Sequence, residues 1–251
     1  MMRKAIVPIM AIIAATALST SALAETKTMT LDDFSQIKTY TSVDFDISVG
    51  QKQSITVAGR AEDLAKIIMV VKRGILIVEK EKNSGHMKKV NVTLTVKNLS
   101  KFEVHGSSDA IIRDVDSKSF EIDIKGSGDV RFRGKSDELA VKISGSGDVA
   151  SGGFDAGKVS AKINGSGDIA LAGKCKKLEL SISGSGDFAG AHLTCADVEA
   201  QISGSGDADL YASTSVRVKT SGSSDVNVYG QPKSIQNSSS GSTNFTVHVG
   251  K

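Results

Sequence analysis

The chain has 251 residues, with 31 Lys and Arg against 28 Asp and Glu, and no Trp. This near balance of charge, without a basic stripe interleaved with aromatic residues, argues against a nucleic-acid partner. The chain has 2 prolines and 25 glycines, a composition that suits regular, stacked β-structure better than a loop-rich enzyme.

Residues 1–24 have the pattern of a secretory signal peptide. A positively charged start precedes a mostly apolar run from Ala5 to Leu18, and Ala22-Leu23-Ala24 forms a small-residue cleavage site. The run is shorter than the roughly 20 residues of a membrane span, so removal is expected rather than anchoring. Glu25, not cysteine, follows the expected cut, which argues against a lipoprotein anchor. The sequence therefore predicts an exported protein that is periplasmic, on the outer surface or secreted, and does not span a membrane after cleavage.

Residues 25–100 contain several short stretches in which apolar and polar residues alternate. The stretch AEDLAKI is expected to form one or two short helical turns, and Arg73-Gly74 a turn between two strands. We interpret this region as an N-terminal cap with the first coils of a stack, because an open end would expose core and unpaired backbone. The predicted strands lie in SVDFDISVG, SITVAG, the two halves of IIMVVKRGILIVEKE, and VNVTLTV.

Residues 101–251 contain a repeat built on Gly-Ser-Gly-Asp. The motif or a close variant recurs at intervals of 18 to 20 residues, with alternating apolar residues before and after it. Alternation with period two predicts a strand on either side of each glycine-rich turn. A hairpin meander would not favour identical turns at every other corner, whereas a coil that advances one strand per repeat would. The motif glycines are Gly106, Gly126, Gly145, Gly165, Gly184, Gly204, Gly222 and Gly241.

We therefore predict an all-β fold, a parallel β-helix with about 19–20 residues per coil, in which residues 25–251 form one continuous domain. Cys175 and Cys195 occupy the same place in consecutive coils, so their Cα atoms should lie about 5 Å apart and form a disulfide. The same register predicts one inward column, made by Val104, Ile124, Ile143, Ile163, Ile182 and Ile202.

A family resemblance rests on the order of these elements. The succession FSQIKTYTSVDFDISVGQKQSITVAG, LAKIIMVVKRGILIVEKEKN, VNVTLTVKNLSKFEVHGSSD and serial ISGSGD resembles the head GIN domain family over residues 30–250. That family is labelled as auto-transporter adhesins and is otherwise of unknown function. The resemblance implies a right-handed parallel β-helix and transfers no catalytic residues. Because no further run of membrane strands follows the repeats, a complete autotransporter is not expected.

The last residue of the motif predicts a column of carboxylates, with neighbours about 5 Å apart. One explanation is structural: Asp and Ser accept hydrogen bonds from N–H groups of the turn. The alternative is a row of Ca²⁺ ions, although the known calcium β-roll repeat, G-G-x-G-x-D, matches only in part. No other cofactor is expected. The candidate calcium ligands are Asp129, Asp148, Asp168, Asp187 and Asp207.

Catalysis is the least expected function. The carboxylates are equivalent, whereas an acid and base pair needs two different environments. The four histidines, His86, His105, His192 and His248, lie in unrelated positions without metal-ligand spacing. A polysaccharide-active enzyme is therefore the weakest alternative.

A non-catalytic binding or adhesin-like module is the preferred function, with a glycan or another component of the cell envelope as partner. Its candidate surface is a regular polar face beside the turns. Self-association through the C-terminal coil, whose NFTVHVGK edge has no obvious cap, is a second hypothesis. The residues of the candidate face are Ser144, Asn164, Ser183, Ser203 and Ser221.

Overall fold

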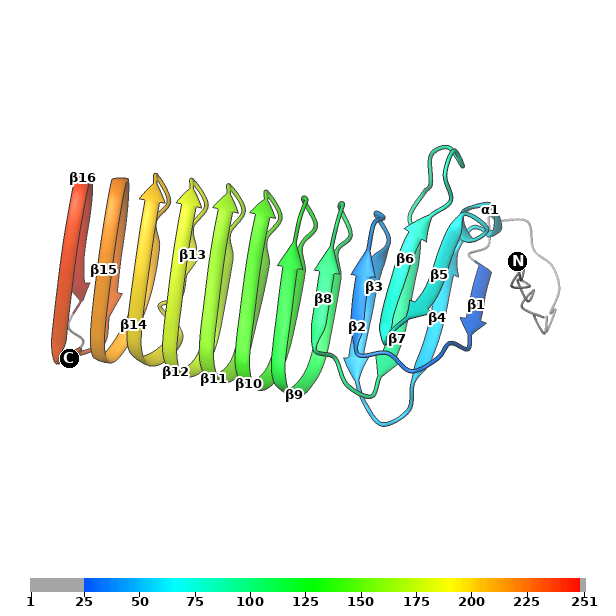
Figure 1. Ribbon diagram of the computed structural model, residues 1–251, viewed down its shortest axis with the longest axis horizontal. Coiled ribbons are helices and arrows are strands. Elements are labelled where there is room, and N and C mark those ends of the chain that lie inside the picture. Colours follow the sequence, from blue (N-terminus) through cyan, green and yellow to red (C-terminus); the bar gives the residue numbers. More distant parts are fainter. Residues whose placement is uncertain (1–24, 249–251) are drawn as a thin grey trace, which may run out of the picture.

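The computed structural model describes residues 25–248, so the predicted signal peptide lies outside the described residues. A single 16-stranded sheet is wound into an elongated β-solenoid, which confirms the predicted fold class (Figure 1). The N-terminal cap lies at one end of the rod and the C-terminal coil at the other. In this part of the chain, no helix has the length and apolarity needed to cross a membrane.

The repeats form parallel coils stacked along the rod. Each motif lies at a narrow corner. The earlier motifs form the small loops above the arrowheads in Figure 1, whereas the last two lie within the last two strands. The strands are β8 (Lys101–Val104), β9 (Ala110–Ile124), β10 (Val130–Gly145), β11 (Val149–Gly165), β12 (Ile169–Gly184), β13 (Phe188–Ala189), β14 (Leu193–Gly204), β15 (Ala208–Tyr229) and β16 (Ser234–His248).

The polar segments GKSDE and GKCKK, which separate the apolar stretches of the repeats, are part of the strands. In β10 and β12 the chain bends at Gly134 and Gly173, whose φ angles are 141° and 132°. Glycine adopts such angles without steric cost. The coil therefore turns its wide corner while remaining paired with the coils on both sides.

The N-terminal region contains the expected helical turn, α1 (Ala61–Leu64), and the expected hairpin turn. Arg73 and Gly74 both have positive φ, 53° and 76°, as a two-residue type I′ turn requires. The strands of this region are β1 (Glu25–Met29), β2 (Gln36–Thr39), β3 (Asp44–Val49), β4 (Ser54–Gly59), β5 (Ile67–Lys72), β6 (Ile75–Lys80) and β7 (Asn91–Val96).

The first coil is enclosed by later parts of the chain. β2 pairs with β6 on one edge and with β8 on the other, and β3 lies between β7 and β9 in the same way. After β1, which lies at the outer edge beside β4, the chain enters the stack at β2 and β3. It then runs outward through β4 to β7 to build the cap, and returns at β8 to continue the stack (Figure 1).

The predicted inward column is confirmed, because consecutive members are paired in register from Val104 to Ile202 and every one is buried. The rings of Phe120, Phe132 and Phe154 lie 5.1 to 6.2 Å apart in the middle of the core. Such aromatic contacts add to the stability gained from burial alone.

The predicted disulfide is present. Cys175 of β12 pairs in register with Cys195 of β14, and their Cα atoms are 4.5 Å apart. The bond ties together two neighbouring coils that are 20 residues apart in sequence.

The core becomes partly polar in the last coil, although Phe245 and Val247 still pack against it. Val218, which is fully buried, is followed in register by Asn237, and Thr220 is followed by Ser239. Polar residues at inward positions reduce the apolar surface that the end of a solenoid would otherwise expose. Ile235 nevertheless remains 46% exposed on β16.

Candidate functional site

The corner motif owes its glycines to the close approach of consecutive coils. A Cβ atom on Gly165 would lie 2.3 Å from the carbonyl oxygen of Gly145, and one on Gly147 would lie 2.3 Å from that of Gly128. No side chain tolerates contacts of this length. In the middle of the stack the first and third positions of the motif are therefore restricted to glycine.

The terminal repeats carry hydroxyl groups at the third position, and those of Ser108 and Thr243 have partners. Ser108 is fully buried; its hydroxyl donates to the Thr41 carbonyl oxygen at 3.0 Å and lies 3.2 Å from Thr39 Oγ1. At the other end, Thr243 Oγ1 donates to Thr220 Oγ1 at 3.0 Å. The degenerate motifs thus provide hydrogen bonds at the two ends of the stack.

The aspartate column is a ladder of hydrogen bonds between coils. Each aspartate N–H donates to Oδ1 of the aspartate in the preceding coil, at 2.7 to 3.1 Å from Asp109 through Asp225. This arrangement supports the structural explanation for the column. Within residues 25–248 no three His, Cys, Asp or Glu side chains are grouped so as to hold a metal ion.

Calcium binding by the column stays a prediction. A ligand that binds only the folded chain raises its unfolding midpoint by mass action. Midpoints measured in EDTA and in millimolar Ca²⁺ would therefore test it.

The predicted polar face is a continuous row on the opposite side of the corner. Its members are paired in register and all are exposed. In contrast to the aspartates, their side chains form no hydrogen bond to any other described residue. We call this row the serine column; it consists of Ser144, Asn164, Ser183, Ser203 and Ser221.

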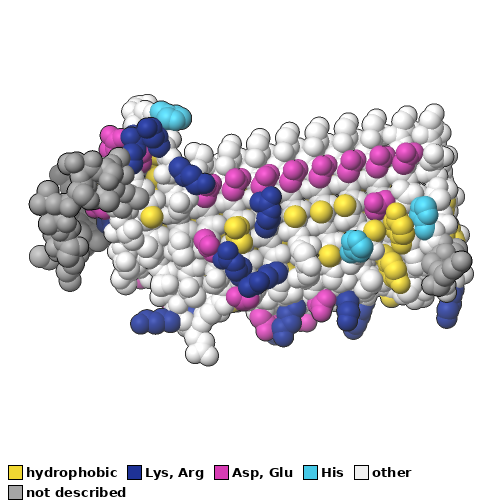
Figure 2. Space-filling model, turned by 180° about the vertical axis from the view of Figure 1, so that it is seen from behind, with side chains coloured by type: hydrophobic (Ala, Val, Ile, Leu, Met, Phe, Trp, Pro, Cys, Tyr) yellow, Lys and Arg dark blue, Asp and Glu magenta, His cyan; other side chains and the backbone are white. Residues whose placement is uncertain are grey.

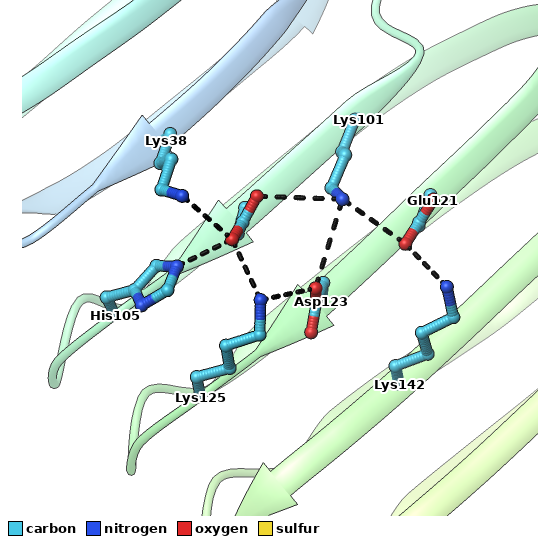
Figure 3. A network of polar contacts seen from close by, with 8 residues as sticks. Lys38, Lys101, His105, Glu121, Asp123, Lys125 and Lys142 are labelled. Carbon is cyan, nitrogen blue, oxygen red and sulfur yellow. Dashed lines mark hydrogen bonds and ion pairs between the residues drawn. The ribbon is translucent and has the colours of Figure 1, made fainter.

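A network of charged side chains lies at the cap end of the same row (Figure 3). Glu103 of β8 is its centre, with Lys125 at 2.9 Å, His105 at 2.6 Å and Lys38 at 3.1 Å. His105 also stacks on Tyr40, with ring centroids 4.7 Å apart. Further pairs join Lys101 to Glu121 and Asp123, Lys125 to Asp123, and Lys142 to Glu121.

The network sets the charge state of its central residue. Burial of Glu103 favours the neutral acid, but hydrogen bonds from Lys125, His105 and Lys38 outweigh this and hold the pKa of Glu103 well below its ordinary value of 4.5. Hydrogen bonds to Glu103 and Asp123 likewise raise the pKa of Lys125. These shifts describe a structural ion cluster that links the first coils, since each group has its charge matched by neighbours.

The face behind the corner bears the aspartate ladder and several hollows (Figure 2). On this face hydrophobic side chains run along the rod below the acidic row, basic side chains lie among them nearer the cap, and histidines lie both at the cap and near the far end. One hollow of about 350 Å³ has Arg113, Arg131 and Arg133 around Ile112 and Phe132. A second, of about 1030 Å³, lies at the C-terminal end; its lining includes His192, Asp209, Tyr211, Tyr229, Lys233 and His248.

A family model described as "Putative auto-transporter adhesin, head GIN domain" matches residues 33–154 and 133–232, which is most of the chain. The chain belongs to the head GIN domain family. Among curated proteins no match is found.

Solved structures share the head GIN fold over nearly their whole length. A "putative adhesin" from Parabacteroides merdae has a TM-score of 0.85 and 20% identity, over 90% of this chain and 96% of its own. A "putative lipid binding protein" from Parabacteroides distasonis has a TM-score of 0.82 and 22% identity, over 90% and 97%. A "putative adhesin" from Bacteroides fragilis has a TM-score of 0.70 and 19% identity, over 92% and 100%. At these identities the likeness establishes the fold.

Two features of this head GIN chain were missed from its sequence. The Glu103 network joins β2 to β8, and the spacing of the repeats does not predict the pairing of β2. The second feature, a group of planar side chains around the C-terminal hollow, did leave a signal in the sequence. His192, Tyr211, Tyr229 and His248 are spaced by 19, 18 and 19 residues, the period of the repeat, and all four line the hollow.

Proposed function

We propose that this head GIN chain is an exported, non-catalytic binding module of the cell envelope, which holds a glycan through the serine column. The observation that carries the proposal is the row of exposed hydroxyl and amide groups without partners among the described residues. The adhesin description of the family and the signal-peptide pattern of residues 1–24 are consistent with this role.

The contrast between the two polar columns supports this choice of surface. The aspartate Oδ1 atoms already accept hydrogen bonds from the backbone, whereas the serine column is free to exchange water for a ligand. Its side chains recur at the strand spacing of about 4.8 Å on a rigid sheet. A ligand lying along the rod would meet several preorganised groups at once, which lowers the entropic cost of binding.

The proposal is tested with the triple variant Ser144→Ala, Asn164→Ala and Ser183→Ala. Each lost hydrogen bond weakens binding by about 0.5–1.5 kcal/mol, so retention on purified cell-envelope polysaccharide should fall by at least about tenfold. The control variant, Ser119→Ala with Thr214→Ala, removes exposed hydroxyls elsewhere and should bind as the wild type does. Equal retention of all three proteins would contradict the proposal, as would a failure of the wild type to bind.

Self-association is a second candidate, favoured by the free edge of the last coil. In the described structure β16 pairs only with β15, and an unpaired edge is a template for another strand. If this edge joins two copies, light scattering at increasing concentration should show a dimer, and Phe245→Lys, on β16, should reduce it. A strict monomer at high concentration would contradict this candidate.

A further inference from the structure

Four planar side chains gather at the C-terminal end of the face that bears the aspartate ladder. The chain has 3 tyrosines and 4 histidines, and two of each line a single hollow there. Figure 2 shows histidine and hydrophobic side chains near this end of the acidic row. We call this hollow the aromatic cleft, and define it by His192, Tyr211, Tyr229 and His248.

The rings of the aromatic cleft are held in place by the coils beneath them. Tyr229 of β15 and His248 of β16 are paired in register, and their rings stack at 4.8 Å with planes 16° apart. Gly230 has φ of 95°, and a Cβ atom there would lie only 3.2 Å from Tyr211 Cζ. The missing side chain at Gly230 therefore leaves room for the Tyr211 phenol.

A chain of hydrogen bonds fixes the polar groups of the cleft. Asn227 Nδ2 donates to Asp209 Oδ1 at 3.0 Å, and Asn227 Oδ1 lies 2.9 Å from His248 Nε2. Asp209 and His248 line the hollow together with Lys233. Asn227 thus fixes the orientation of the Asp209 carboxylate through its amide nitrogen and of the His248 ring through its amide oxygen. Groups held in place in this way lose less entropy when a ligand binds.

The lining indicates the chemistry of the ligand. Among the described lining residues, one carboxylate, Asp209, is balanced by one ammonium, Lys233, so these residues favour no charged ligand. Among the described residues of the lining, Ala191 is the sole aliphatic side chain, which is too little for an acyl chain. Flat rings combined with fixed hydrogen-bonding groups suit a molecule that has apolar C–H faces and many hydroxyls. The volume of about 1030 Å³ is at the upper end for small-molecule sites.

We propose that the aromatic cleft binds a pyranose ring of a neutral saccharide. One face of such a ring exposes C–H groups, which pack on Tyr229 or Tyr211, while its hydroxyls reach Asp209, Lys233 and the histidines. The inference extends the proposed glycan-binding function, but it uses residues outside the serine column and is tested separately from it.

The tyrosine content of the chain provides a direct measurement. Because there is no Trp and only 3 Tyr, the variant Tyr40→Phe leaves Tyr211 and Tyr229 as the sole tyrosine fluorophores. Both line the cleft. Titration with maltotriose, cellotriose or triacetylchitotriose should change the tyrosine emission in a saturable way for at least one of them. No saturable change with any of the three would overturn the proposal.

Variants locate the binding on the full chain, with saturation-transfer NMR on the sugar protons as readout. His192→Ala, at an exposed position, and Tyr229→Ala should each weaken binding at least about tenfold. The matched control is Tyr40→Ala, which removes an exposed tyrosine that also stacks on a histidine but lies outside the cleft. The thermal midpoint of each variant verifies its folding, and His192→Ala keeps the test valid if Tyr229→Ala unfolds.

The experiments distinguish the serine-column proposal from the aromatic-cleft proposal. Loss of trisaccharide binding in the serine-column triple variant, with full binding by His192→Ala and Tyr229→Ala, would overturn the aromatic cleft and leave the proposed function intact. Trisaccharide binding that depends on the cleft, in a chain that is not retained by envelope polysaccharide, would overturn the serine column instead. Tyrosine emission that responds to palmitate and to none of the sugars would overturn the saccharide assignment.

Discussion

Single glycines control how closely the coils stack. Gly165 has φ of 137°, and a Cβ atom there would meet the Gly145 carbonyl oxygen at 2.3 Å. Backbone strain and overpacking together predict that Gly165→Ala lowers the free energy of unfolding by about 3 kcal/mol. The matched control is Gly152→Ala, because nothing lies within 4 Å of a Cβ atom at Gly152. Urea denaturation should show a large loss of unfolding free energy for Gly165→Ala and little change for Gly152→Ala.

The aspartate ladder is best tested at its centre, where Asp168 accepts from Asp187 N–H at 2.8 Å. Asp168→Ala removes the acceptor and should lower the free energy of unfolding by about 1 kcal/mol. Asp168→Asn keeps an oxygen at the same place and removes a charge flanked by Asp148 and Asp187, so it should stabilise the chain slightly at low salt. The gain should disappear in 1 M salt, which screens exposed charges. Destabilisation by both variants to the same extent would contradict a role in hydrogen bonding.

Between elements, the Glu103 network joins β2, β8, β9 and β10. Glu103→Gln leaves Lys125, Lys38 and His105 without their common carboxylate and should cost about 2 kcal/mol at pH 7, measured by urea unfolding. The pKa of Glu103 is depressed in the folded chain, so its contribution is complete above the ordinary value of 4.5 and falls as the pH is lowered below it.

The pH dependence of this stability difference tests whether the network acts through the charge of Glu103. The difference in unfolding free energy between the wild type and Glu103→Gln should shrink from pH 5 toward pH 2. The control, Glu138→Gln, changes an exposed glutamate whose side chain has no partner among the described residues, and should have no such profile. A difference that is constant with pH would show that the network does not act through its charge.

The disulfide joins the same two elements that the sheet already pairs, β12 and β14. Closing a loop of this length stabilises a folded chain by about 3 kcal/mol through the unfolded state. Urea unfolding with and without dithiothreitol should show this loss, and the double variant Cys175→Ala, Cys195→Ala should match the reduced wild type. Equal stability of the oxidised and reduced chains would contradict the expectation.

At the scale of the whole molecule, coils are interchangeable units. Gly145 and Gly165 are paired in register, so deletion of residues 146–165 joins equivalent points and preserves every column. The shortened chain should fold cooperatively, with a rod shorter by about 4.8 Å in small-angle scattering and a lower free energy of unfolding. Deletion of residues 146–155 breaks the register and should abolish cooperative unfolding; a folded half-coil variant would contradict this view of the stack.

The periodicity of the sequence explains which parts of the fold were predictable. The inward column and the pairing of Cys175 with Cys195 follow from the spacing of the motif, because each coil repeats the one before. The position of β2 does not, because its partners in β6 and β8 belong to different segments without a common period. The aspartate ladder was expected as a column, but its bonds between coils depend on side-chain rotamers that spacing does not specify. The aromatic cleft was predictable in principle from the period that relates Tyr211 to Tyr229.

The enclosed first coil also has a consequence for how the chain folds. Thr39 and Ser108, which meet at its corner, are 69 residues apart in sequence, whereas partners in later coils are about 20 apart. Closing the longer loop costs more entropy and is slower. We therefore expect the cap to act as the folding nucleus, to which the coils add one after another. A chain truncated after any complete coil should then keep a folded N-terminal region. A chain that lacks its first hundred residues should have no nucleus and should not fold.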